Sequence, residues 1–205
     1  MATQPLSPDD VFINCPFDDD YAPIFQALIF TIYACGFRPR SALELDDGGQ
    51  TRIEKLFRII EQCRYGIHDL SRTEPDEQNQ LPRFNMPLEL GIFLGAKHYG
   101  DEAQGDKRVL ILDVEKYRYQ RFISDLAGMD IHEHGGDGVR AARETRNWLA
   151  NVSRRKLDSA ERIGHLLQSF LSDLPEIAAN WDFDQAQIPH VDFERIEIGW
   201  LTHDA

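Results

Sequence analysis

Short apolar runs alternate along this chain with segments whose apolar side chains recur at helical spacing. The clearest runs are "VFINCPF" at 11–17, "YGIHDLS" at 65–71 and "RVLILDV" at 108–114, with weaker ones at 37–44 and near residue 130. Between the strand candidates, the segment 51–64 has apolar residues at i, i+3, i+4 and i+7, namely Ile53, Leu56, Phe57 and Ile60. This alternation predicts an α/β fold in which parallel strands are joined by right-handed crossovers and covered by helices on both faces.

Residues able to contact a ligand follow two of the predicted strands. In parallel sheets, ligands bind beyond the carboxyl ends of the strands, at the switch in strand order. The first predicted strand ends at Asn14, Cys15 and Pro16, and the third ends around Asp69 and Ser71. We expect these side chains to border one shared site.

One carboxylate lies inside an otherwise apolar helix, "PRFNMPLELGIFLGAKHYG" at 82–100. Asn85 suits the N-cap of this helix and Pro87 suits its first turn, which places Glu89 about one turn in. Burial raises the pKa of such a carboxyl group, whereas a nearby helix N-terminus lowers it. The position fits a nucleophile or a general base. It fits equally a structural ion pair with Arg83 or Arg52.

Three further patterns have both a chemical and a plain interpretation. "DDGGQTR" at 46–52 can hold a phosphate on backbone N–H groups beside Arg52, or form an ordinary turn; it lacks the Lys-Ser/Thr ending of a P-loop. "HEH" at 132–134 has no third ligand at a known spacing and is typical of a surface loop, so we predict no metal site. Gly91 and Gly95 indicate close packing of their helix against the sheet.

The charge balance argues against one large class of partner. With 35 acidic and 22 basic residues, the net charge is −13, which disfavours binding to duplex nucleic acid. One local group of arginines still suffices for a small anionic substrate. No apolar run approaches the length of a membrane span, the first ten residues lack the pattern of a signal peptide, and the three cysteines fit buried, reduced thiols. We therefore expect a cytoplasmic protein with no membrane partner.

The chain divides softly near residue 135, at "HGGDG". Residues 10–135 contain the alternating strands and helices, and residues 136–205 form a helical C-terminal extension that packs on this domain or on a partner. One of its helices is expected to stop before Pro175. These C-terminal helices are the expected contact with a second copy of the chain or with another protein.

The segment around Glu89 resembles a known family. "ELG" at 89–91, followed by a helix and the apolar strand of "KRVLILDVEKYRY", resembles the nucleoside 2-deoxyribosyltransferases, a flavodoxin-like family related to the Toll/interleukin-1 receptor (TIR) domains. "VFINCPFDDDYAPIFQALIF" at 11–30 is similar to that family's first strand, base-contacting loop and first helix. The resemblance covers roughly residues 10–115. It implies a flavodoxin-like three-layer sandwich around a central, mostly parallel sheet.

The resemblance implies two catalytic residues. Glu89 is expected to act at C1′ of a ribose, as the nucleophile or as the carboxylate that stabilises an oxocarbenium ion, and Asp69 is expected to contact the sugar or the base. Cleavage of an N-glycosidic bond builds positive charge at C1′ and leaves a base that needs a proton. Asp69 or His68 can supply that proton. Because side chains alternate along a strand, only one of these two faces the rim, and we expect Asp69 there and His68 in the core.

The resemblance also implies a set of substrate contacts. Asn14 and the turn formed by Cys15, Pro16 and Phe17 are expected to border the nucleobase. Where the family has an acidic residue and a glycine-rich run before its glutamate, this chain has "RFNMP". Arg83 and Asn85 then become candidates for phosphate or sugar contacts. The candidate set of binding residues is completed by Arg52 and Ser71.

The resulting expectation is an enzyme that cleaves an N-glycosidic bond in a nucleoside, a nucleotide or NAD, as a hydrolase or a deoxyribosyltransferase. The nucleotide or NAD is then the substrate, and no cofactor is expected. The TIR-like relatives imply an effector role in defence against phage. The alternative is a non-catalytic TIR-like module that senses a nucleotide or assembles with itself.

Overall fold

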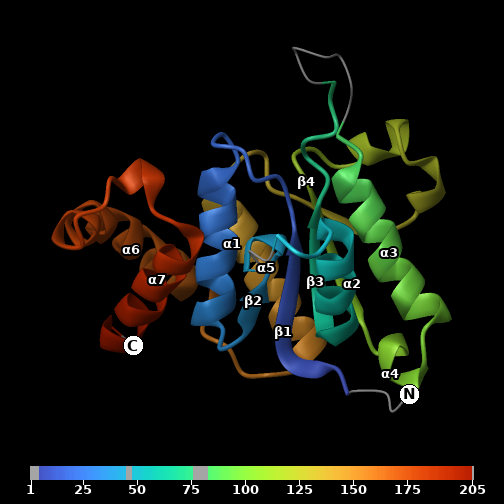
Figure 1. Ribbon diagram of the computed structural model, residues 1–205, viewed down its shortest axis with the longest axis horizontal. Coiled ribbons are helices and arrows are strands. Elements are labelled where there is room, and N and C mark those ends of the chain that lie inside the picture. Colours follow the sequence, from blue (N-terminus) through green and yellow to red (C-terminus); the bar gives the residue numbers. More distant parts are fainter. Residues whose placement is uncertain (1–4, 45–47, 76–82, 205) are drawn as a thin grey trace.

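The computed structural model describes residues 5–44, 48–75 and 83–204, and its centre is a five-stranded sheet (Figure 1). The strand order is β2-β1-β3-β4-β5, and each neighbouring pair is parallel. The strands are β1 (Ser7–Asn14), β2 (Arg38–Arg40), β3 (Cys63–Asp69), β4 (Arg108–Asp113) and β5 (Ile131–Glu133). The predicted α/β fold with a parallel sheet is therefore confirmed, and the arrangement is that of a flavodoxin-like three-layer sandwich.

Helices cover both faces of the sheet (Figure 1). On one face lie α1 (Ala22–Ala34) and α5 (Gly138–Ser153), and on the other lie α2 (Arg52–Gln62) and α3 (Asn85–Tyr99), followed by the short α4 (Glu102–Gly105). Alternate residues of β1 supply the two cores, since Val11 and Ile13 face α1 and α5 while Phe12 faces α2 and α3. A strand buried on both faces has apolar residues in an unbroken run, and this is why the strands could be predicted from the sequence.

Pro39 lies where a proline does least harm to a sheet. It is the middle residue of β2, a three-residue strand at the edge of the sheet. Because proline has no backbone N–H to donate to a neighbouring strand, an edge strand is where it is tolerated.

Close packing of α3 on the sheet is made at Gly66 of β3, and the packing role predicted for Gly91 and Gly95 is wrong. A Cβ atom added at Gly91 or Gly95 would meet nothing within 4 Å, because both glycines face away from the sheet. A Cβ atom at Gly66 would lie 2.7 Å from the ring of Phe93, which belongs to α3. The missing side chain at Gly66 thus lets the Phe93 ring rest directly on β3.

Two C-terminal helices add a further layer outside α1 and α5 (Figure 1). They are α6 (Ala160–Asn180) and α7 (His190–Asp204). The Phe170 ring of α6 stacks on Phe30 of α1, with 5.2 Å between ring centroids. Single turns of 3-10 helix connect the main elements, at Ala42–Glu44 (η1), Arg118–Arg121 (η2), Ser124–Leu126 (η3) and Gln185–Gln187 (η4).

The expected end of a helix before Pro175 is wrong, because α6 continues through that residue to Asn180. A proline inside a helix costs about 3 kcal/mol, because it removes one backbone hydrogen bond and crowds the preceding turn. Leu174 and Ala178, on either side of it, are both buried in the protein. Tertiary packing of these neighbours offsets the local cost.

The division predicted at residue 135 stays a prediction. The structure adds that α5, beyond that point, shares the core of the sheet, where Ala141, Trp148 and Leu149 pack with residues of β1 and β4. Within the described ranges, no helix combines the length and the apolar character that crossing a membrane requires.

We predict that Phe170→Ala lowers the free energy of unfolding of the whole chain by about 3–5 kcal/mol, in a single transition. The Phe170 ring contacts Phe30, Phe193 and Trp200, so its loss leaves a cavity between α1, α6 and α7. Urea denaturation followed by circular dichroism and tryptophan fluorescence measures the change.

The neighbouring variant Leu171→Ala is the control, because Leu171 is exposed and its truncation is expected to cost less than about 1 kcal/mol. Two separated transitions, with only the first shifted by Phe170→Ala, would show that α6 and α7 unfold independently of the sandwich.

Candidate functional site

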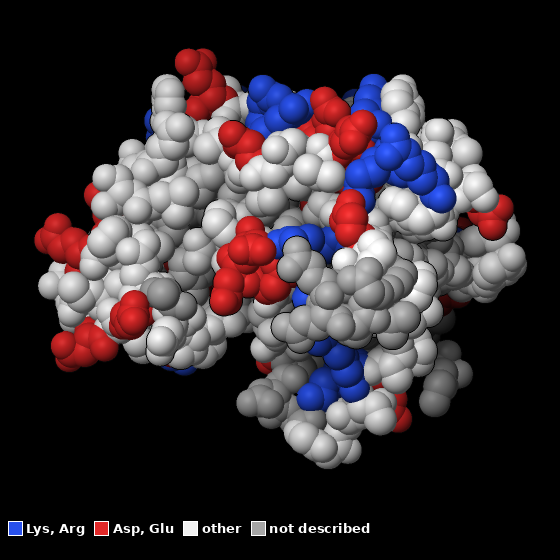
Figure 2. Space-filling view, turned by 90° about the horizontal axis from the view of Figure 1, so that it is seen from above, with Lys and Arg blue, Asp and Glu red and all other residues white. Residues whose placement is uncertain are grey.

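The candidate site lies at the edge where β1, β3 and β4 end. This edge is uppermost in Figure 1 and faces the viewer in Figure 2, where acidic and basic side chains lie beside one another. Buried polar residues gather at the strand ends, namely Asn14, His68, Asp69, Asp113 and His134, together with Ser71 just beyond β3. Parallel strands bring these residues together although they are far apart in the sequence.

Glu89 is the buried acid of this edge that lacks a partner. Its side chain is only 6% exposed, and no described residue forms a hydrogen bond or an ion pair with its carboxylate. Burial raises the pKa of Glu89 to about 7, and the charge of Arg52 acts weakly in the opposite direction. The structural ion pair with Arg83 or Arg52 is therefore not formed. At neutral pH the group is poised between its charged and neutral forms.

The start of α3 differs from the prediction, because Asn85 is not the N-cap. The N-cap is Phe84, whose side chain makes no capping hydrogen bond, and Asn85 is the exposed first residue of the helix. The amide Nδ2 of Asn14 instead donates to the backbone oxygen of Met86, 2.8 Å away. A tertiary contact from β1 thus fixes the first turn that carries Glu89.

Asn14 and His68 form a buried pair beneath this turn. Asn14 Nδ2 lies 3.0 Å from His68 Nδ1, so the ring nitrogen accepts and His68 carries its proton on Nε2. The imidazole lies between the rings of Phe12 and Phe93 and is fully buried. Burial, and then the charge of Lys107, lower the pKa of His68 to about 3. His68 is thus a neutral core residue, and its partner Asn14 holds α3 in place.

Asp69 is also fully buried, but both of its oxygens have partners. Oδ1 accepts the backbone N–H of Ser71 at 2.8 Å, and Oδ2 lies 3.0 Å from Nε2 of His134. His134 Nδ1 accepts the N–H of Gly136, so its Nε2 carries the proton that faces Asp69. Burial raises the pKa of Asp69, yet His134 and Ser71 together bring it below its ordinary value. Asp69 is therefore an ionised, paired carboxylate at neutral pH and a poor proton donor.

The end of β4 carries a second compensated acid. Asp113 is fully buried, and its Oδ1 accepts hydrogen bonds from Nε and Nη2 of Arg118 at 2.9 and 2.7 Å. Nη2 of Arg118 also donates to the backbone oxygen of Leu70, at 2.6 Å. Arg118 thereby joins the end of β3 to the end of β4. Burial still raises the pKa of Asp113 above its ordinary value.

The turn after β1 brings a thiol and a phenol to the same place. Cys15 and Tyr21 are buried, and burial followed by the charge of Asp69 raises the pKa of both groups well above its ordinary value. The charge of Glu89 makes a further, smaller contribution to the raised pKa of Cys15. Pro16 is buried beside them, and the ring of Phe17 is half-buried, with the guanidinium of Arg52 5.8 Å from its centroid.

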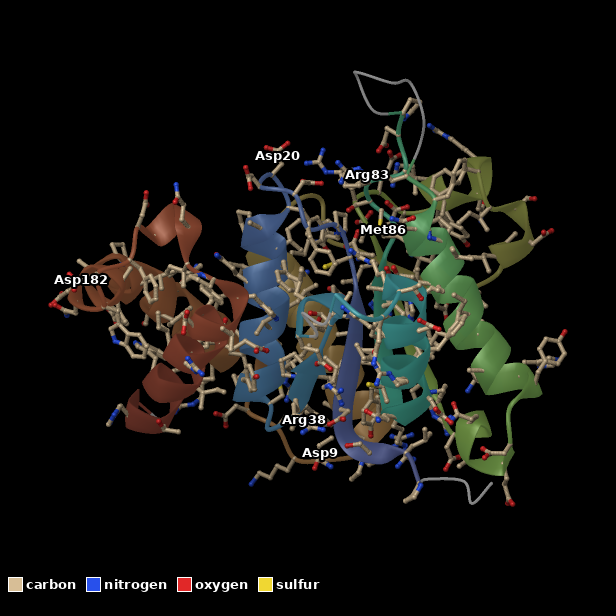
Figure 3. The ribbon with its side chains drawn as sticks, in the orientation of Figure 1. Asp9, Asp20, Arg38, Arg83, Met86 and Asp182 are labelled. Atoms are coloured by element: carbon tan, nitrogen blue, oxygen red, sulfur yellow. The ribbon has the colours of Figure 1, made fainter. Side chains whose placement is uncertain are left out.

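Ion pairs join the two loops above the site. Asp18, after β1, accepts from Arg72 and from Arg83, each at 3.0 Å, and Asp20 accepts from Arg72 at 2.9 Å. Figure 3 shows Asp20 and Arg83 at this upper edge, above Met86. The predicted ligand contact Arg83 is therefore engaged with Asp18 in this structure, and Asn85 lies exposed beside it.

The placement of "HEH" as a surface loop is wrong. These residues lie on and just after β5, and His134 is buried against Asp69 while His132 contacts Glu144 at 2.8 Å. The two rings therefore serve different partners. The described residues include no group of three or more His, Cys, Asp or Glu side chains placed to hold a metal ion.

Sequence reasoning missed three members of the site, which are Tyr21, Arg118 and His134. Each lies in a loop after a strand, but only the strand order shows which acid it serves. The one available signal was position, since His134 immediately follows the last predicted strand. Of the "DDGGQTR" turn, Asp46 and Asp47 lie outside the described residues, while Thr51 forms a capping box with Glu54.

Comparison of the chain with protein-family models, curated proteins and solved structures finds no match. The function therefore has to be inferred from the site itself.

We predict that Glu89→Gln stabilises the protein at alkaline pH. A raised carboxyl pKa means that the folded state binds more protons than the unfolded state between pH 4.5 and about 7, so stability falls as pH rises through this window. Glutamine keeps the shape and removes the titration. The variant is therefore expected to match the wild type near pH 4.5 and to exceed it by up to roughly 3 kcal/mol at pH 8.

Urea denaturation at the two pH values measures this difference, with Glu176→Gln, an exposed glutamate of α6, as the control. A Glu89→Gln variant less stable than the wild type at pH 8 would mean that the carboxylate has a stabilising partner, contrary to this description.

Proposed function

We propose that this chain is an enzyme that cleaves an N-glycosidic bond in a nucleoside, a nucleotide or NAD, with the carboxylate of Glu89 acting at the sugar C1′. The observation that carries the proposal is the burial of Glu89 without a partner at the carboxyl edge of a parallel sheet. A carboxylate in this position costs stability, and such a cost is typical of functional groups. No structural partner of Glu89 among the described residues offers another reason for it.

The chemistry needs negative charge opposite a developing positive charge. As the bond to the base breaks, C1′ and the ring oxygen become oxocarbenium-like, and a carboxylate in a poorly hydrated site stabilises this state or attacks C1′. The cation at C1′ also favours the ionised form of Glu89, so the group binds the transition state better than the ground state, in which C1′ carries no such charge. Activity is then expected to require the ionised form.

The state of Asp69 favours one substrate class. A purine or pyrimidine leaves a neutral nucleoside best when an acid protonates it, but Asp69 is ionised and paired with His134. A nicotinamide ring attached to ribose is already cationic and leaves as a neutral base without receiving a proton. The arrangement therefore supports NAD, or a related pyridinium nucleotide, ahead of ordinary nucleosides. Arg52, exposed beside Phe17, is available to a phosphate group.

The second candidate function is a nucleotide-sensing module that binds without cleavage. The observation that favours it is that Asp69 is engaged with His134 and Ser71, and the Asn14 amide nitrogen with Met86, so neither side chain is available to assist a leaving base. In this case the same edge binds a nucleotide, and the outer helices α6 and α7 contact a second copy or another protein. An effector role in defence against phage belongs to the proposal in either form.

We predict that the wild-type chain releases nicotinamide from NAD or NADP, and that Glu89→Gln lowers the rate by at least about 100-fold, because the neutral amide cannot stabilise positive charge at C1′. Chromatography of reactions with NAD, NADP, nucleosides and nucleoside monophosphates identifies any free base. Glu176→Gln, which changes an exposed glutamate of α6 and leaves both carboxylates of the site in place, is the matched control and is expected to retain activity.

The two functions give different results in the same assay. Saturable binding of NAD or a nucleotide by calorimetry, with no base released from any compound, would overturn the enzyme and favour the sensing module. Equal base release by wild type and Glu89→Gln would overturn the role of Glu89.

A further inference from the structure

A second carboxyl group without a partner lies outside the candidate site, in α7. Glu197 is 0% exposed, and neither of its oxygens has a hydrogen-bond partner in the part of the chain that the structure describes. Its neighbours on the helix, Phe193 and Ile196, pack into the apolar layer formed with α1 and α6. An ionised carboxylate in such a place costs several kcal/mol. Burial, and then the charge of Glu194, raise the pKa of Glu197 well above its ordinary value, which favours the neutral acid in the docked helix.

The titratable groups around Glu197 do not compensate its charge. On α7, Glu194 accepts a hydrogen bond from the hydroxyl of Tyr33 in α1, at 3.1 Å, and lies 3.9 Å from Nε2 of His190. Burial, and then the charge of Glu194 and its hydrogen bond, raise the pKa of Tyr33, and the charge of Glu197 adds to this rise. The nearest charged neighbour is thus another acid, and it favours the protonated form of Glu197.

The charged residues on the other elements packed against α7 are either paired with residues other than Glu197 or are acids themselves. On α6, Asp173 accepts a hydrogen bond from the indole of Trp200, at 3.0 Å. On η1, Glu44 is paired with Arg40. On β2, Arg38 is paired with Asp10 at 2.6 Å. No described cation is therefore free to stabilise ionised Glu197 in the docked position.

Aromatic rings connect the start of α7 to the candidate site. The ring of His190 lies 5.5 Å from the ring of Phe25 in α1, and Phe25 meets Phe17 edge-on at 5.2 Å. Phe17 belongs to the turn after β1, and the guanidinium of Arg52 lies 5.8 Å from its centroid. The charge of Arg52 also opposes the rise that burial causes in the pKa of Glu89. Movement of α7 therefore has a route through ring contacts to the turn after β1.

We propose that α7 is a proton-linked strap, which stays docked on α1 while Glu197 holds a proton and loosens the turn at residues 14–21 when it is released. Once released, Glu197 meets water and loses its proton at neutral pH. The released state thus binds one proton fewer than the docked state, so rising pH favours release. Between the ordinary pKa and the raised docked pKa of Glu197, the opening equilibrium constant increases about tenfold for each pH unit.

Hydrogen–deuterium exchange of the full chain tests the strap at pH 7 and pH 8, with wild type compared with Glu197→Gln. Glutamine is isosteric but does not titrate, so the pH dependence of the intrinsic exchange rate cancels in the ratio of the two proteins. The opening of segment 190–204 in the wild type, relative to the variant, is expected to rise from pH 7 to pH 8, by at most about tenfold. Residues 14–21 are expected to follow in the same direction.

The test uses the change with pH in the ratio of wild-type to variant opening, and not the size of that ratio at one pH. A loss of stability in Glu197→Gln that is the same at both pH values therefore does not affect the result. Glu197→Leu, which removes the polar atoms altogether, is expected to show the same absence of pH dependence, and Glu176→Gln is expected to match the wild type. A ratio that stays constant between pH 7 and pH 8 would overturn the strap. A rise confined to 190–204 would overturn its link to the site, and an equal rise in β3 would show global unfolding instead of release.

Discussion

The parallel strands β3 and β4 end side by side, which brings the buried acids Asp69 and Asp113 close to one another. The partner that each acid finds determines how the loops at this edge are held. Asp69 is compensated by His134 from the loop after β5, and Asp113 by Arg118 from the loop after β4. These pairs connect loops that are distant in the sequence and hold them over the strand ends. Glu89 receives no such partner from the described residues, and burial raises its pKa to about 7. We therefore interpret the paired acids, Asp69 and Asp113, as structural, and Glu89 as the candidate catalytic residue.

Glu89 and Glu197 are both buried carboxyl groups without a partner among the described residues, but their surroundings differ. Glu89 lies at the carboxyl edge of the sheet, whereas Glu197 lies in a mostly apolar layer between helices. A buried carboxyl group can respond either to a ligand's charge or to solvent pH, according to which of the two reaches it. The ring contacts from His190 through Phe25 to Phe17 connect the start of α7, which carries Glu197, with the turn after β1 at the candidate site.

The order of strands and helices could be predicted because strands buried on both faces leave continuous apolar runs, and the helix at 52–62 has clear periodicity. The anomaly of Glu89 was also visible, since the surrounding helix has few polar residues. The pairing of Asp69 with His134 was not predictable, because it depends on the order β3-β4-β5 in the sheet. Local rules failed at Asn85 and Pro175 for a related reason: contacts from Asn14, and packing around Leu174, overrode the preference of the single residue.

The charge state of Glu89 is the central claim, and it can be measured directly. A carbon-13 NMR titration of the side-chain carboxyl, assigned by its absence in Glu89→Gln, reports the pKa without assuming any activity. The account predicts a midpoint near 7. A midpoint at or below the ordinary value of 4.5 would show a compensated, structural carboxylate and would contradict the proposed role of this residue.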